Sequence, residues 1–234
     1  TPLYSSAASD VYKRQALRYY EEALKITRIT KNVEDESDCL TNIGDVYISV
    51  GNYEKALEYL NEVLRIDQQQ KFHSYVAIDL NNIGVTYQKK WLLSNEKDDL
   101  AKALAYFEES FRIAKKIKNT KLEIQASNNI GMVYEDLENY PEALKYFFLS
   151  LENAEKSRDI KETANILVNI GSVYFKQNDY DRSIEYCQKA IDKASETKGE
   201  KALWQPYLEM ANAAMKKGDY QESLEHYKNS ITFI

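Results

Sequence analysis

The chain has 234 residues and combines 19 tyrosines with only 7 glycines and 3 prolines. So few turn-forming residues in a chain of this length indicate long helices joined by short connections. A formal net charge of −6 argues against nucleic acid or an anionic membrane as the main partner. The apolar runs are far shorter than the roughly 20 residues of a membrane-spanning helix, so no transmembrane segment is predicted.

The first fifteen residues, "TPLYSSAASDVYKRQ", show none of the periodicity of the rest of the chain. Part of this stretch is similar to translated sequencing-adapter text. We therefore predict that residues 1–15 are a non-native leader, disordered or irregular. The alternative is a native leader, either disordered or a short helix. The repeat domain is predicted to cover residues 16–234.

Both ends of that domain look cut. Residues 16–30 have the pattern of a second repeat helix whose first helix is missing. At the other end, "NSITFI" (229–234) stops in an apolar stretch, without the polar capping helix that helical repeat arrays usually carry. We expect the chain to be a fragment of a longer protein.

One phrase returns through the chain as "LTNIGDVY" (40–47), "LNNIGVTY" (80–87), "SNNIGMVY" (127–134), "LVNIGSVY" (167–174) and the divergent "YLEMANAA" (207–214). Its anchors are Gly44, Gly84, Gly131, Gly171 and Ala211, with spacings of 40, 47, 40 and 40 residues. A small residue precedes each anchor by 28 positions, at Ala16, Ala56, Ala103, Ala143 and Ser183, and a tyrosine by 25, at Tyr19, Tyr59, Tyr106, Tyr146 and Tyr186. A fixed period of this size predicts an all-α or other solenoid built from repeated units.

Each repeat divides into two helical patterns. Leu40, Ile43, Gly44 and Tyr47 lie on one face of a first helix, and Ala56, Leu57, Leu60 and Leu64 on one face of a second. Short segments such as "VGNY" (50–53) separate the two helices, with residues suited to a helix stop and a new start. The spacing of 47 reflects a seven-residue insertion within "QKKWLLSNEKDD" (88–99). There Trp91 either extends the first helix and packs on the next repeat, or contacts a partner from the rim of a groove.

This pattern resembles the tetratricopeptide repeat, W-x2-L-G-x2-Y followed by A-x3-F and P. Leu40-x2-Ile43-Gly44-x2-Tyr47 and Ala56-x3-Leu60 carry the resemblance, and its second half recurs as Ala103-x3-Phe107 and Ala143-x3-Phe147. The tryptophan is replaced, and the closing proline is absent, since Gln68, Lys115, Glu155 and Ser195 stand in its place. Second helices that run on past this point account for a 40-residue unit, similar to those of kinesin light chains, spindle-orienting scaffolds and bacterial tetratricopeptide sensor kinases.

The resemblance implies a right-handed α–α superhelical solenoid of about five units plus one leading half-repeat helix. We expect the anchor glycines to lie where two helices approach closely, facing the small residues of the Ala56 column. The tyrosines are expected to fill the space between units. Gly51 and Gly218 are assigned to turns and Gly199 to a connection between repeats. No glycine is then left for a phosphate-binding loop.

In the resembled family the first helices line a concave groove that holds peptides. The positions opposite the buried face predict the groove residues of this chain, which are Asn42, Asp45, Asn82, Val85, Lys89, Asn129, Met132, Asp136, Asn169, Ser172 and Lys176. The four asparagines form a row that could hold an extended peptide backbone, because an amide both donates and accepts hydrogen bonds. The alternative is that these asparagines are scaffold residues that bond the adjacent helix.

No catalytic motif is present. His73 is expected at a turn between repeats and His226 stands in the tyrosine column, so both are interpreted as structural. Cys39 and Cys187 fit no metal pattern and are expected to be free thiols in a reducing, cytoplasmic compartment, or in the periplasm if a signal precedes the chain. We expect no enzyme activity, no cofactor and no metal.

The sequence thus predicts a non-catalytic scaffold that binds a protein or peptide in its groove, and neither nucleic acid nor a membrane. The alternative function is a sensory or regulatory segment of a larger bacterial signalling protein, such as a histidine kinase or a transcriptional regulator.

Overall fold

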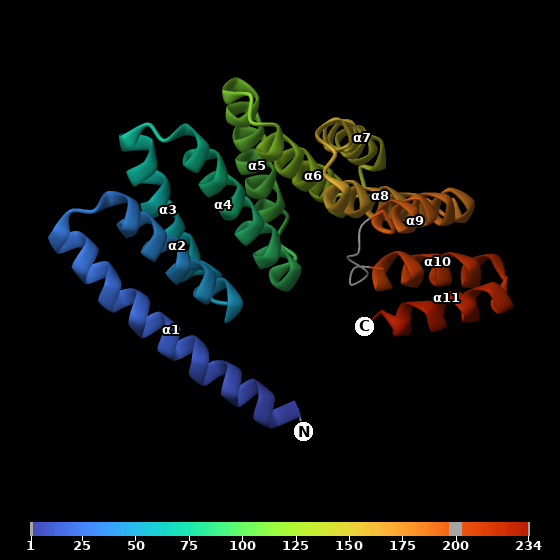
Figure 1. The fold of residues 1–234 in the computed structure, drawn as a ribbon, viewed down its shortest axis with the longest axis horizontal. Helices are drawn as coiled ribbons and strands as arrows, with labels where there is room; N and C mark the ends of the chain where they lie inside the picture. The colour runs from blue at the N-terminus through green and yellow to red at the C-terminus, as the bar shows by residue number, and fades with distance from the viewer. Residues whose placement is uncertain (1, 197–202, 234) are drawn as a thin grey trace. The chain divides into compact units, whose positions relative to one another are not determined.

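The computed structural model describes residues 2–196 and 203–233, and within these ranges the chain is helical and contains no strand. The helices are α1 (Pro2–Thr30), α2 (Val33–Ser49), α3 (Tyr53–Gln70), α4 (His73–Ser94), α5 (Lys97–Ile117), α6 (Thr120–Asp136), α7 (Tyr140–Ser157), α8 (Ile160–Lys176), α9 (Tyr180–Ala194), α10 (Trp204–Lys217) and α11 (Tyr220–Thr232) (Figure 1). The all-α repeat fold predicted from the sequence is confirmed.

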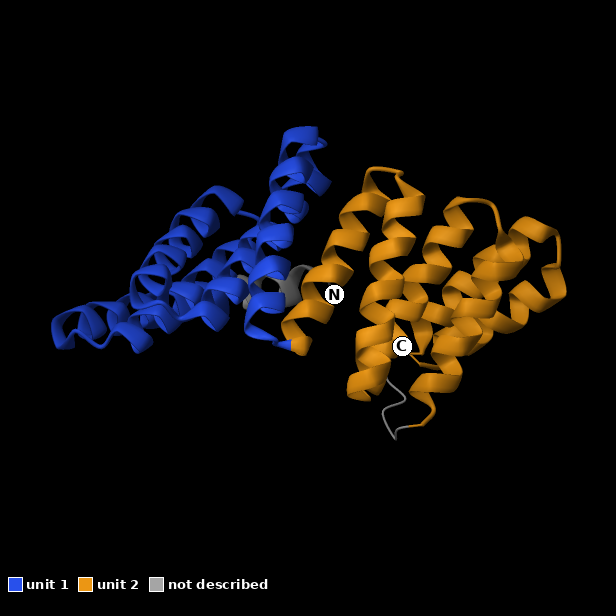
Figure 2. Cartoon of the chain, turned by 90° about the horizontal axis from the view of Figure 1, so that it is seen from above, with its two compact units in different colours: residues 1–119 blue, residues 120–234 orange. Residues whose placement is uncertain are grey.

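The chain divides into two compact units, residues 1–119 and residues 120–234 (Figure 2). The first unit contains α1 and the hairpins α2–α3 and α4–α5. The second contains the hairpins α6–α7, α8–α9 and α10–α11. Within each unit, the first helix of a repeat packs on its own second helix and on the second helix of the preceding repeat. This alternation is how each repeat buries an apolar face that it could not bury alone.

Residues 2–15 differ from the expectation of an irregular leader, because α1 is a continuous helix from Pro2 to Thr30. Alanine, arginine and glutamine favour the helix here, and Pro2 stands at its first position, where a missing N–H is tolerated. Lys13 lies close enough to α2 for its Nζ to donate to the carbonyl of Ser49 at 3.1 Å. The origin of the leader stays a prediction.

The anchor glycines lie where two helices of one repeat approach closely, as expected. A Cβ on Gly84 would lie 2.6 Å from the ring of Phe107, and one on Gly131 would lie 2.7 Å from the ring of Phe147. The nearest side chain in each case belongs to the residue four positions after the small-residue column. The predicted approach to that column is also present at two anchors, since a Cβ on Gly44 would lie 3.7 Å from the carbonyl of Ala56 and one on Gly171 would lie 3.2 Å from that of Ser183. Gly51 and Gly218 have positive φ angles of 76° and 89°, which confirms their assignment to turns. Gly199 lies outside the described residues.

Tyrosines stack in pairs within four of the hairpins, and Tyr186 also contacts Phe148 of the preceding repeat, so the predicted filling of space between units is confirmed in part. Parallel pairs, with ring centroids 5.3 to 5.7 Å apart, are Tyr47–Tyr59, Tyr87–Tyr106, Tyr134–Tyr146 and Tyr174–Tyr186. A cation lies over one ring of each pair, the shortest distance being 4.3 Å from Arg182 Cζ to the centroid of Tyr174. Each stack therefore joins the first and second helix of one repeat.

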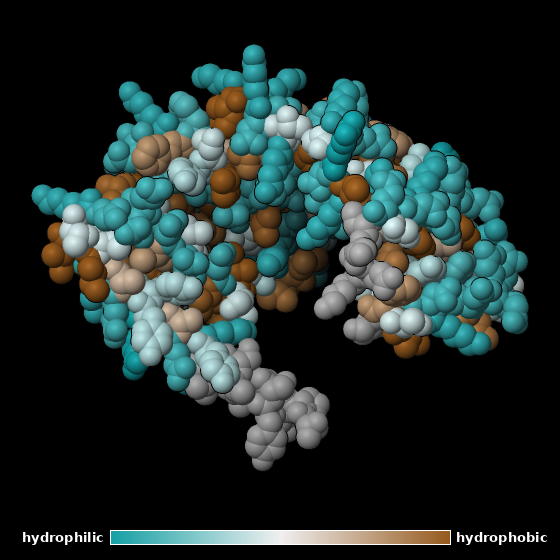
Figure 3. Space-filling model, in the orientation of Figure 1, coloured by the Kyte–Doolittle hydropathy of each residue, from teal (hydrophilic) through white to brown (hydrophobic). Residues whose placement is uncertain are grey.

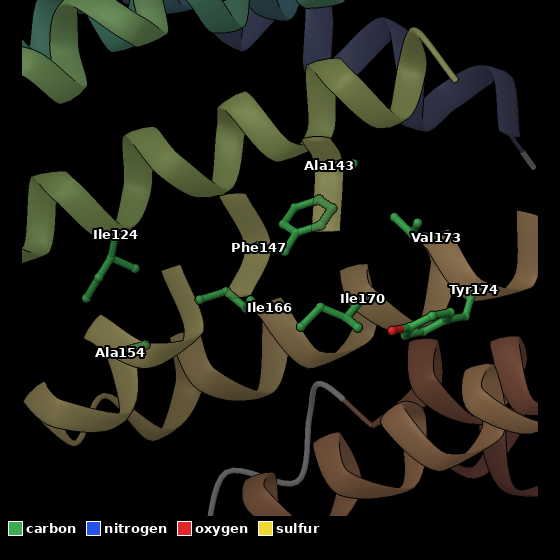
Figure 4. Close-up of a cluster of buried hydrophobic side chains, with 8 residues drawn as sticks. All are labelled: Ile124, Ala143, Phe147, Ala154, Ile166, Ile170, Val173 and Tyr174. Atoms are coloured by element: carbon green, nitrogen blue, oxygen red, sulfur yellow. The ribbon is translucent and has the colours of Figure 1, made fainter. Parts of the chain in front are cut away.

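The joint between α7 and α8 is apolar. Its core cluster contains Ile124, Ala143, Phe147, Ala154, Ile166, Ile170, Val173 and Tyr174, contributed by α6, α7 and α8 (Figure 4). Phe147 and Ile166 are fully buried. Ser150 Oγ donates to the carbonyl of Ile124 at 2.9 Å, so this buried hydroxyl is also satisfied.

Four of the turns that follow second helices are of one type, whereas Ser195 after α9 is in the right-handed conformation. The residue after the second helix is Lys31, Lys71, Lys118 or Arg158, each in the left-handed conformation with φ between 55° and 61°. The next residue donates its N–H to a carbonyl in the last helical turn, as Asn119 does to Ala114 and Asp159 does to Ala154, both at 3.0 Å. This is the hydrogen bonding of a Schellman motif. The cationic side chain also suits the negative end of the helix dipole.

Second helices run past the missing proline, as predicted, at Gln68, Lys115 and Glu155, whereas α9 ends at Ala194 and Ser195 is its cap. The insertion does extend a first helix, since α4 has 22 residues and α2, α6 and α8 have 17 each.

The described surface and helices give no sign of a membrane span. No helix within the described ranges is both long and apolar enough to cross a membrane. On the face drawn in Figure 3, apolar residues are interspersed with hydrophilic ones.

Candidate peptide-binding face

In the first unit, α2 and α4 carry the predicted groove residues Asn42, Asp45, Asn82, Val85 and Lys89. Asn42 is exposed, and its Nδ2 donates to the carbonyl of Asp38 at 2.8 Å, within its own helix. Asn82 and Val85 are half-buried, while Asp45 and Lys89 are exposed. Partial desolvation raises the pKa of Asp45, and the positive charge of Lys89 opposes this shift. The two helices thus present their predicted faces close to each other.

A pocket of about 180 Å³ lies between the repeats of the first unit. It is lined by Glu34, Ser37, Asp38, Thr41, Val63, Asp67, Phe72, Tyr75, Ile78, Asp79 and Asn82, from α2, α3, α4 and the turn before α4. Of the predicted groove residues, Asn82 alone lines it. Phe72 and Tyr75 are partly exposed and meet edge to face, with ring centroids 5.9 Å apart. The pocket therefore combines acidic, amide and aromatic groups.

In the second unit, Asn129, Met132 and Asp136 on α6 and Asn169 on α8 are half-buried. Asn169 Nδ2 donates to Asn128 Oδ1 at 3.0 Å, which joins α8 to α6. This is the kind of contact that the alternative interpretation describes, while the role of Asn169 in peptide binding stays a prediction. Met132 packs against the apolar cluster of the α7–α8 joint, so part of its side chain belongs to the core.

Glu135 connects the other predicted groove residues of the second unit. Its Oε1 accepts a hydrogen bond from Ser172 Oγ at 2.8 Å and forms an ion pair with Lys176 Nζ at 3.0 Å. Desolvation and then the charge of Glu135 raise the pKa of Glu209 on α10, and Lys176 opposes this shift. Ser172 and Lys176 are thus already engaged by neighbouring first helices. The sequence interpretation missed Glu135, which stands one position outside the predicted stripe.

Trp91 is half-buried, whereas the neighbouring Leu92 and Leu93 are exposed. The insertion is held at its base by Asp99, a buried residue that accepts a hydrogen bond from Ser94 Oγ at 3.4 Å and pairs with Lys90 Nζ at 3.6 Å. Whether Trp91 packs on the next repeat or contacts a partner stays a prediction.

The residues that the sequence set aside as structural lie apart from this face. His73 is exposed at the start of α4, and His226 lies on α11, 3.5 Å from Glu222 Oε1. Cys39 and Cys187 are free thiols, and burial raises the pKa of Cys187 to about 12. No group of three or more His, Cys, Asp or Glu side chains in the described part of the chain could hold a metal ion.

The family model of the tetratricopeptide repeat matches residues 13–69, 36–90, 93–156 and 162–228. Together these matches cover most of the chain and include all five predicted anchors.

Among curated proteins, the chain is similar to the photosystem I assembly protein Ycf3. The protein from Rippkaea orientalis is 34% identical over 116 residues, which cover 47% of this chain and 62% of the relative. The protein from a Synechococcus species is 32% identical over 108 residues, which cover 46% and 57%. The chain therefore spans about three fifths of the length of these relatives.

Several solved structures share the fold at low sequence identity. BtubC (BKLC) from P. vanneervenii has a TM-score of 0.80 at 15% identity, with 94% of this chain and 90% of that chain covered. The apo form of RapI has a TM-score of 0.69 at 23% identity, covering 95% and 77%. NprR in complex with its cognate peptide NprX has a TM-score of 0.64 at 17% identity, covering 95% and 67%.

Proposed function

This chain belongs to the tetratricopeptide repeat family, and we propose that it is a non-catalytic module that binds a protein or peptide along the first helices of its repeats. Modules of this kind present side chains from successive repeats on one extended surface. The free thiols of Cys39 and Cys187 favour a reducing, cytoplasmic compartment for this function.

The pocket between α2, α3 and α4 is the observation that carries this proposal. It offers the half-buried amide of Asn82 beside partly exposed aromatic rings, and ligand sites in proteins combine a concave apolar surface with a few polar groups in this way. Its size suits a single side chain, since a cavity of about 150 Å³ takes up a benzene ring. A peptide is the occupant that could place one side chain here while its backbone meets further amides on neighbouring helices.

The solved structures give supporting context. NprR is described in complex with a peptide, and its fold resembles that of this chain over 95% of this chain's length. The likeness to Ycf3, named as an assembly protein, is consistent with a role in bringing other proteins together. Neither identifies the ligand of this chain.

The test begins with selection of binding peptides from a random displayed library on the full chain. The dissociation constant of a selected peptide is then measured for the wild type and for the double variant Asn42→Ala, Asn82→Ala, both in the first unit. We expect binding to weaken about fivefold or more, since two hydrogen-bonding amides are removed. The melting temperature is expected to change by only a few degrees, because Asn42 is exposed and Asn82 is half-buried.

Asn61→Ala is the matched control. Asn61 is an exposed asparagine on α3, and its Nδ2 donates to the carbonyl of Leu57, the same contact within a helix that Asn42 makes. Its replacement should leave peptide binding unchanged. A large loss of melting temperature in the double variant would assign its asparagines to the scaffold, and failure to select any peptide would remove the proposal.

The second candidate is a regulatory segment of a larger signalling protein. The structural likeness to RapI and NprR is the observation that favours it, although at this identity it extends to the fold alone. The two candidates differ in what the bound peptide changes. A regulatory segment is expected to transmit binding to an attached domain, whereas a scaffold only joins its partners. Activity of the natural full-length protein, measured with and without a selected peptide, separates them.

A further inference from the structure

Two buried aspartates meet in the pocket of the first unit. Asp67 on α3 is 3% exposed and Asp79 on α4 is 4% exposed, and their carboxyl groups lie close enough for each to affect the pKa of the other. Ser37 Oγ on α2 also donates to Asp67 Oδ1 at 3.0 Å. The second oxygen of Asp79, Oδ2, is buried and has no hydrogen-bond partner.

Two interacting carboxyl groups at a buried site are expected to share one proton, so the pair keeps one negative charge at neutral pH. Burial, followed by the charge of Asp67, raises the pKa of Asp79 to about 8. No ion pair of the described residues involves either aspartate, and the further charge that acts on the pair, Asp38, is also acidic. A buried charge without a counter-ion and an unpartnered oxygen are both unfavourable in the unliganded chain.

The repeat architecture does not need this pair. In the register of the repeats, the position of Asp67 is taken by Thr27, Ala114, Ala154 and Ala194, and that of Asp79 by Cys39, Ala126, Ile166 and Pro206. In the second unit, Ala154 and Ile166 belong to the apolar cluster of the α7–α8 joint. The same joint therefore forms without charge, which points to a role for the aspartates other than packing.

The other walls of the pocket are complementary to an organic cation. Glu34 and Asp38 add negative charge from α2, and Phe72 and Tyr75 add aromatic rings that attract cations. A divalent metal is a poor fit, since no three acidic or histidine side chains of the described residues are arranged to hold one. An ammonium or guanidinium group needs no such ligand set, because it donates hydrogen bonds in several directions.

We propose that the pocket binds the cationic end of a lysine or arginine side chain, donating to Asp79 Oδ2, and that a polypeptide ligand carries this side chain. That the ligand is a polypeptide rests on the proposed function, because Asn82 of the predicted groove lines the same pocket. Binding supplies the missing counter-charge and gives the unpartnered oxygen a donor.

Titration of the full chain with small probes tests the pocket directly. The probes are Nα-acetyl-lysine methylamide, its arginine counterpart and the uncharged norleucine counterpart, followed through the NMR shifts of backbone amides around Asp79. We expect one of the two basic probes to bind at least about tenfold more tightly than norleucine. Asp79→Ala should weaken that probe by about tenfold, because it removes the acceptor oxygen, and alanine already stands at the equivalent position 126.

Glu58→Gln is the matched control, because it removes a carboxylate from the exposed face of α3, outside the pocket. The Glu58→Gln variant should bind the basic probe with the same affinity as the wild type. The proposal is overturned if neither basic probe binds more tightly than norleucine, or if Asp79→Ala binds the basic probe as well as the wild type does. Spermidine is a further probe. Binding about tenfold tighter than both blocked amino acids would indicate a free polyamine, and so overturn the polypeptide source.

The peptides selected in the test of the proposed function separate the two proposals. Selected peptides that lack an enriched lysine or arginine would leave the proposed function standing and remove this inference. A positive titration without any selected peptide would remove the proposed function and the polypeptide source, while showing that the pocket itself recognises a cation.

Discussion

The α3–α4 joint of the first unit and the α7–α8 joint of the second are built on the same repeat register but with different chemistry. The α7–α8 joint is filled by apolar side chains such as Ala154 and Ile166. The α3–α4 joint places Asp67 and Asp79 at the matching positions and leaves a pocket beside them. One joint is packed for stability, and the other retains a charged pair that opposes it.

This difference shows where to look for function in a repeat protein. Every repeat must bury its joint, so residues that serve the fold recur in the same columns. A residue that departs from its column and is unfavourable for stability calls for another explanation, and binding is the usual one, since stability is commonly given up at functional sites. Asp79 is such a residue, whereas the partnered Lys176 and Ser172 are not.

The largest effect should come from breaking the apolar joint. Phe147 is fully buried against Gly131 and its cluster, so Phe147→Ala should lower the free energy of unfolding by about 3–5 kcal/mol. Phe148→Ala is the control, since Phe148 is 38% exposed and makes only an edge contact with Tyr186, and its loss should be about 1 kcal/mol or less. Urea denaturation followed by circular dichroism measures both. Equal losses would show that the joint is not the main source of stability.

Removing the charge from the α3–α4 joint should raise the free energy of unfolding, the opposite of the effect at the α7–α8 joint. In the folded chain the pKa of Asp79 is raised to about 8, chiefly by burial, against about 3.9 when unfolded. The folded state thus keeps a proton that the unfolded state releases, so stability should fall as pH rises from about 4 to about 8. Asp67, Glu34 and Asp38 face the same pocket and, being acidic, oppose ionisation further.

Asp79→Asn should therefore raise the free energy of unfolding at about pH 8 by roughly 2–4 kcal/mol, and by much less at about pH 5. Denaturant curves at both pH values measure this difference. Glu58→Gln should show no comparable gain, because Glu58 is exposed. A variant that is less stable than the wild type at the higher pH would contradict a raised pKa and the picture of a charged joint that opposes folding.

The smallest effect concerns the glycines next to the two joints. A Cβ at position 131 would lie 2.7 Å from the rigid ring of Phe147, whereas one at position 44 would lie 3.1 Å from Cγ and Cδ2 of Leu60, which would have to shift by only a few tenths of an ångström. Gly131→Ala should lose about 1–2 kcal/mol. In Gly44→Ala, the higher helix propensity of alanine should offset the crowding to within about 0.5 kcal/mol. Thermal unfolding of both variants checks the order, and a larger loss at position 44 would contradict it.

The fold could be predicted because its determinants are periodic. The anchor glycines, the alanine column and the short turns recur at fixed spacing, so the helical hairpins and close approaches followed from the sequence. The side chains that meet at each close approach between helices could not be predicted in the same way. Helical periodicity shows which face a residue occupies but not which neighbour it meets, so Phe107 rather than Ala103 opposes Gly84, and the tyrosines pair within hairpins.

The candidate site was harder to predict, for the same reason. The predicted stripe includes Asn82 at the pocket, but not Asp67 or Asp79, which lie on the faces assigned to the core. A signal was present, since an aspartate stands in each of two columns that otherwise hold only uncharged residues, namely threonine and alanine in one and cysteine, alanine, isoleucine and proline in the other. Their juxtaposition on neighbouring helices, however, depends on how α3 and α4 pack, which no spacing within one helix reveals.

The turns after the second helices have a consequence for how such a chain can change over generations. Lys31, Lys71, Lys118 and Arg158 end their helices in the same left-handed geometry, without needing glycine. A segment exchanged between any two of these points keeps a compatible helix stop at both of its borders. Whole modules can therefore be duplicated, deleted or shuffled with little local strain, so a copy with a new pocket can arise beside copies that keep only the scaffold.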